Sequence, residues 1–127
     1  GDPGELRVTV RGTTSTYQPV RAKEFITDTS VRANKKNIEV YDKKVEGIFK
    51  NSNGYEYNRL TDDKNTKKQL GAMIDELPSE THSSAGDSFG LYALISFVAK
   101  GVKEQIERSD SFEKRIERLE ELENGTK

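Results

Sequence analysis

The spacing of apolar and polar residues predicts short strands in the first half of the chain. Residues 6–11 (Leu-Arg-Val-Thr-Val-Arg) alternate strictly, which is typical of a strand with one face on a core. Residues 37–50 also alternate and are rich in β-branched and aromatic side chains, which favours a hairpin, although their helical spacing leaves a helix as the alternative. Residues 51–54 (Asn-Ser-Asn-Gly) predict a turn. Tyr55 and Tyr57 would then share one face of the next strand.

Longer apolar patterns predict two helices in the second half of the chain. Between residues 61 and 77, apolar residues recur at i, i+3, i+4 and i+7, and Pro78 ends this helix. Residues 78–88 are small and polar, which indicates a linker or loop. Residues 89–99 are mostly apolar, so a helix there should be buried on all sides, but the run is too short for the roughly 20 residues that span a bilayer. The helix then becomes amphipathic, and Ser109 marks a point where it could break.

The last helix carries an apolar stripe that fits a heptad repeat in part. One core position holds Ile95, Val102, Ser109 and Ile116, and the other holds Val98, Gln105, Phe112 and Leu119. We expect copies of the chain to associate through this helix, with interface residues Leu91, Leu94, Ile95, Val98, Val102, Ile106, Phe112, Ile116 and Leu119. In the alternative, residues 89–106 pack on the sheet of the same chain, which stays a monomer.

Together these patterns predict an α+β fold. A small β-rich N-terminal part, built of hairpins or a meander, is followed by a short helix and a long C-terminal amphipathic helix. The expected organisation is a β-rich domain with a closing helix over residues 1–77, a polar linker over residues 78–88 and a helical oligomerisation segment over residues 89–124.

Composition strengthens the expectation of assembly. Apolar residues make up only 31% of the 127 residues and charged residues 34%, so the core of a single copy should be thin. The chain has no cysteine, which excludes disulfides, thiolate metal ligands and a cysteine nucleophile. The first four residues are polar, so we expect no secretory signal and assign the protein to the cytoplasm.

The charges are divided unevenly along the chain. Ten basic and five acidic residues lie between positions 7 and 50, whereas acidic residues are in excess after position 60. An anionic partner such as nucleic acid could contact the basic side chains, which are Arg7, Arg11, Arg32, Lys35, Lys36, Lys43, Lys44 and Lys50. The alternatives are a mixed solvated surface, and aromatic rings that form the core of the sheet instead of stacking on bases.

No motif predicts a catalytic or metal centre. Residues 86–90 (Gly-Asp-Ser-Phe-Gly) match the pattern around a nucleophilic serine, but His82, the single histidine, lies before Ser88, whereas that fold places the base after it. The twelve residues from Asp28 to Glu39 fail as a calcium loop because basic residues occupy ligand positions. Glycine-rich phosphate loops are absent from the sequence, and we expect no cofactor and no metal.

Two classes of function follow from these features. The first is a non-enzymatic, oligomeric module for protein interaction or assembly, in which the C-terminal helix joins copies of the chain. The second is a nucleic-acid-binding protein that uses its basic N-terminal β part to contact DNA or RNA phosphates.

Overall fold

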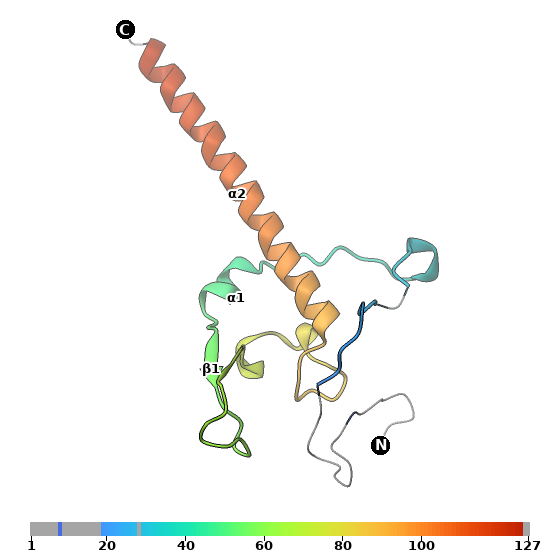
Figure 1. Cartoon of the computed structure of the whole chain (residues 1–127). Helices are drawn as coiled ribbons and strands as arrows, with labels where there is room; N and C mark the ends of the chain where they lie inside the picture. Colours follow the sequence, from blue (N-terminus) through green and yellow to red (C-terminus); the bar gives the residue numbers. More distant parts are fainter. Residues whose placement is uncertain (1–7, 9–18, 28, 126–127) are drawn as a thin grey trace. The chain divides into compact units, whose positions relative to one another are not determined.

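The computed structural model describes residue 8, residues 19–27 and residues 29–125 (Figure 1). The chain forms two units, Gly1–Ile38 and Glu39–Lys127. In the described part of the first unit, regular structure consists of the short 3-10 helix η1 (Arg32–Asn34). The strand predicted over residues 6–11 lies outside the described residues, except for Val8.

The described part of the second unit contains two α-helices and a two-stranded antiparallel sheet. Its elements, in chain order, are α1 (Glu46–Lys50), β1 (Tyr55–Tyr57), β2 (Gln69–Gly71), the 3-10 helices η2 (Ile74–Glu76) and η3 (Ser79–Thr81), and α2 (Leu91–Gly125). This combination confirms the predicted α+β fold class. The predicted division into a β-rich domain (residues 1–77), a linker (residues 78–88) and a helical oligomerisation segment (residues 89–124) stays a prediction.

The hairpin predicted over residues 37–50 is wrong. Backbone N–H groups of Ile48 and Phe49 donate to the carbonyl of Val45, and α1 replaces the second strand. The helical spacing of these three residues puts Val45, Ile48 and Phe49 on one face, where they pack against α2. β-branched and aromatic side chains favour strands where they pack on the surface of a sheet. Here they pack against helix α2, so this preference does not decide the local structure.

The small sheet forms in part where the sequence predicts it. Tyr55 and Tyr57 are both half-buried and Glu56 is exposed, so the two tyrosines share one face of β1 as expected. In the antiparallel register Tyr55 pairs with Gly71 and Tyr57 with Gln69. A Cβ at Gly71 would lie 3.1 Å from the ring of Tyr57, so glycine lets the ring lie close to β2.

The helix predicted over residues 61–77 is also wrong. Asp62 accepts a hydrogen bond from the backbone N–H of Arg59 at 2.8 Å, and the Asn58 side chain donates to the carbonyl of Thr66 at 3.0 Å. These local bonds hold a turn where the helix would have begun. The following residues pair with β1, and Leu77 becomes part of the core.

Residues 78–88 are folded against the rest of the second unit. Thr81 is fully buried, and its hydroxyl donates to the carbonyl of Pro78 at 2.7 Å. His82 forms a bridge with Phe89, and its ring packs edge-on against the phenylalanine ring with centroids 6.0 Å apart. This segment therefore positions the start of α2.

Helix α2 is uninterrupted over 35 residues and continues through Ser109, where a break was considered. The prediction that residues 89–99 would be buried on all sides is wrong, because Leu91 is 73% exposed and Ile95 is 65% exposed. The buried residues of α2 are Phe97, Gly101 and Glu104. The chain has too few apolar residues to cover more than one face of this helix. Among the described residues, no helix is long and apolar enough to cross a membrane.

The core of the second unit is small and lies along the first half of α2. Its buried apolar residues are Val45, Leu77 and Phe97. Partly buried residues packed around them are Tyr41, Ile48, Phe49, Ala72, Phe89 and Leu94. Residues 105–125 of α2 are all exposed, so the second half of the helix contributes nothing to this core.

Candidate assembly interface

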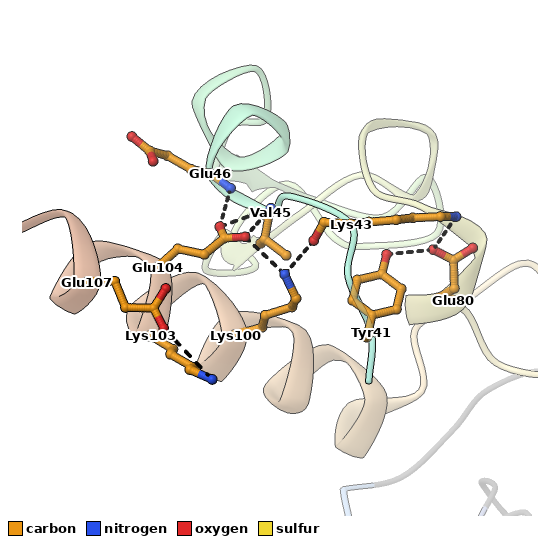
Figure 2. Close-up of polar contacts among 9 residues, drawn as sticks. All are labelled: Tyr41, Lys43, Val45, Glu46, Glu80, Lys100, Lys103, Glu104 and Glu107. Atoms are coloured by element: carbon orange, nitrogen blue, oxygen red, sulfur yellow. Dashed lines mark hydrogen bonds and ion pairs between the residues drawn. The ribbon is translucent and has the colours of Figure 1, made fainter. Parts of the chain in front are cut away.

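A buried carboxylate joins α1 to α2 (Figure 2). Glu104 is only 8% exposed, and its carboxylate accepts hydrogen bonds from the backbone N–H of Val45 at 3.0 Å and of Glu46 at 2.9 Å. These N–H groups belong to the start of α1, where no intrahelical acceptor exists. Glu104 therefore caps a helix from across the core and fixes its position on α2.

A lysine completes this contact from one turn away on α2. The Nζ of Lys100 lies 3.0 Å from Oε1 of Glu104 and also donates to the backbone carbonyl of Lys43. The backbone hydrogen bond from Val45 lowers the pKa of Glu104 below its ordinary value; burial opposes this effect, and Lys100 adds to it. The carboxylate thus stays ionised at neutral pH and holds the backbone before α1.

A second polar contact holds the segment before α1 against η3. The hydroxyl of Tyr41 donates to Oε2 of Glu80 at 2.9 Å, and the Nζ of Lys43 lies 3.5 Å from the same oxygen (Figure 2). The hydrogen bond from Tyr41 lowers the pKa of Glu80, whereas burial and Glu80 raise the pKa of Tyr41. Both shifts favour the ionisation states that keep this contact intact near neutral pH.

The residues that were considered for nucleophilic catalysis have other contacts. The Nε2 of His82 lies 3.0 Å from the carbonyl oxygens of Ile74 and Leu77, so this nitrogen carries the proton. The hydroxyl of Ser88 contacts that of Ser83 at 2.8 Å. No hydrogen bond joins Ser88 to His82 among the described residues. Within residues 19–27 and 29–125, no group of three or more acidic or histidine side chains could hold a metal ion.

An apolar groove runs between α1 and α2 on the surface of the second unit. It has a volume of about 770 Å³, and the residues that line it include Phe49, Lys50, Val98, Val102, Gln105 and Ile106. A Cβ at Gly101 would lie 2.8 Å from the ring of Phe49, so this glycine lets the ring approach α2 closely, and it lines the groove. The groove opens directly onto the stripe of the predicted heptad repeat.

Eight of the nine predicted interface residues are exposed along α2. They are Leu91, Ile95, Val98, Val102, Ile106, Phe112, Ile116 and Leu119. Leu94 differs, because it packs against the core of its own chain. The helix therefore presents an apolar stripe that no other described part of the chain covers.

The basic residues predicted to bind phosphates are exposed where they are described. Arg32, Lys35 and Lys36 lie in the first unit, and Lys43, Lys44 and Lys50 lie in the second. Arg7 and Arg11 lie outside the described residues. Lys43 also forms the contact with Glu80 described above.

Sequence reasoning missed the residues that attach α1 to α2. Glu104 was not among the predicted site residues, and it is buried. The sequence contained an indication of this burial. Phe97, Gly101 and Glu104 are spaced i, i+4 and i+7, so Glu104 lies on the same helix face as the apolar Phe97. An acid on such a face indicates a buried partner.

Comparisons of the chain with protein-family models, with curated proteins and with solved structures find no match.

Proposed function

We propose that this chain is a non-enzymatic assembly module that forms homo-oligomers through α2. The observation that supports the proposal is the exposed apolar stripe, which continues from the folded part of the second unit to Leu119. Contiguous apolar surface of this kind is rare on monomers and is typical of interaction sites. A second copy would cover it with an identical stripe.

The small core gives an independent reason for assembly. Only three apolar residues of the described chain are buried in its core, which is little for a folded unit of this length. A helix that is exposed over residues 105–125 gains stability mainly from packing an apolar face on another element. Association of copies supplies that packing for both helices at once.

The test is the mass of the protein in solution, measured by light scattering across a wide range of concentration. We expect a multiple of the 14.3 kDa chain mass that dissociates on dilution. A single species of 14.3 kDa at the highest concentration would overturn the proposal. We also propose the cytoplasm as its location, because a chain without cysteine needs no oxidising compartment to fold; cell fractionation tests this.

Nucleic-acid binding is the second candidate function. It is supported by the exposure of the six described basic residues and by Phe25, which is 74% exposed in the same basic part of the chain. A titration with single-stranded DNA and RNA tests it. Binding through phosphates would weaken steeply as salt rises from about 50 to 200 mM. Absence of binding at the lower salt concentration removes this candidate.

A further inference from the structure

We infer that α2 pairs with α2 of a second copy as a parallel, in-register, two-stranded coiled coil, an inference that rests on the proposed assembly. The exposed stripe follows a heptad repeat in which position a holds Ile95, Val102, Ser109 and Ile116, and position d holds Leu91, Val98, Gln105, Phe112 and Leu119. Side chains at these two positions form the seam between paired helices.

The charges beside the seam specify the direction of the partner. Position g holds Arg108 and Arg115, and position e holds Glu113 and Glu120. In a parallel pair, position g faces position e of the following heptad in the other helix. Arg115 then meets the partner's Glu120. Arg108, whose guanidinium already forms an ion pair with Glu46 of its own chain, would meet the partner's Glu113 as well. The two-fold symmetry repeats both attractive pairs.

The antiparallel arrangement brings like charges together. In it, position g faces position g and position e faces position e of the partner. Arg108 and Arg115 would then lie near arginines, and Glu113 and Glu120 near glutamates. The same four side chains that attract in a parallel pair would repel in an antiparallel one.

The side chains at positions a and d favour a coiled coil of two helices and fix how these helices are aligned along their length. Position a holds β-branched Ile95, Val102 and Ile116, which is typical of parallel dimers. Gln105 and Ser109 are polar and occupy consecutive seam positions in the middle of the stripe. A shift of register would place these polar groups against apolar residues without hydrogen-bond partners, so they align the two helices.

The pairing leaves the existing core in place. Glu104 packs against α1, and Val102 lies two residues away, which is about 200° around the helix. Phe97 and Ile95 have the same relation, with the phenylalanine buried and the isoleucine exposed. α1 lies beside the seam, because Phe49 and Lys50 line the groove together with Val98, Val102 and Gln105. A second helix along positions a and d would therefore pass along this groove and contact α1 as well as α2.

Single cysteines test this direction, because the chain has no cysteine of its own. Val98 and Leu119 are both exposed d residues, 21 positions apart, or roughly 31 Å along the helix. In a parallel pair, V98C and L119C each cross-link to the identical residue of the other copy under mild oxidation. In an antiparallel pair, at most one of these positions can lie on the two-fold axis.

The control is K114C, which places an equally accessible thiol at position f, on the side away from the seam. We expect both seam variants to form disulfide-linked dimers at least tenfold faster than K114C. If light scattering shows an oligomer but V98C and L119C do not both cross-link, the parallel inference is overturned and the proposed assembly stands. If K114C cross-links as fast as the seam variants, the assigned seam is wrong. A monomer at all concentrations overturns both.

Discussion

Replacing one seam residue by a polar one should weaken assembly by a calculable amount. Ile116 is 54% exposed in the single chain, so roughly half of its side chain is available for burial against another copy. Complete burial of an isoleucine contributes about 1.5–3 kcal/mol, so this residue contributes about 1 kcal/mol in each copy. A dimer contains it twice, which gives about 2 kcal/mol.

This energy corresponds to roughly a 30-fold change in the dissociation constant of a dimer, since about 1.4 kcal/mol is tenfold. I116N should therefore dissociate at a concentration at least 30-fold higher than the unchanged chain does. An asparagine left without hydrogen bonds at the seam would add to this loss. Sedimentation equilibrium at several loading concentrations measures both constants.

The matched control is Leu70→Asn. Leu70 lies on β2, is 78% exposed and is not part of the stripe on α2. We expect L70N to assemble like the unchanged chain. Two results would refute the reasoning: an unchanged dissociation constant for I116N, or an equal weakening by L70N, since the latter would mean that any exposed apolar residue drives a non-specific association.

Three further predictions concern the charges and the core. R115E and E120R should each assemble poorly alone but should form a heterodimer when mixed, which native mass spectrometry detects; equal homodimer formation would contradict the charge pairing. F97A should lower the free energy of unfolding in urea by about 3 kcal/mol, because Phe97 is buried in the core. The pKa of Glu104 is lowered in the folded state, so its stabilisation is present at neutral pH and is lost as the pH falls through that lowered value. E104Q should therefore reduce the melting temperature at pH 7 more than at pH 3, and E107Q, at an exposed ion pair, should change it little at either pH.

The predictions from the sequence were most accurate where apolar residues repeat regularly on one face of an element. The stripe from Leu91 to Leu119 repeats over several turns, and a helix satisfies it in only one way. Tyr55 and Tyr57 follow a turn signal and share a face as predicted. In both cases, the local pattern and the observed structure agree.

The failures occurred where contacts distant in sequence decide the structure. Val45 begins a short helix because Glu104, far along the chain, accepts hydrogen bonds from the backbone there. The pattern between residues 61 and 77 is helical, but Gln69–Gly71 pair with β1 instead. A local cause adds to this one, because the turn at Asp62 lies where the helix would have begun. Burial of Glu104 was missed for the same reason, since its partners on α1 lie almost sixty residues earlier.

The folded part of the second unit packs against the beginning of α2, while the rest of this helix, from Gln105 on, stays exposed. In a parallel pair the two folded parts would therefore be carried at the same end of the coiled coil. If each folded part bound the same ligand, a ligand with repeated sites could contact both folded parts of the dimer. The second contact would then form at the high effective concentration set by the first. Weak binding by each folded part would then give tight binding by the dimer, without any change in the binding residues.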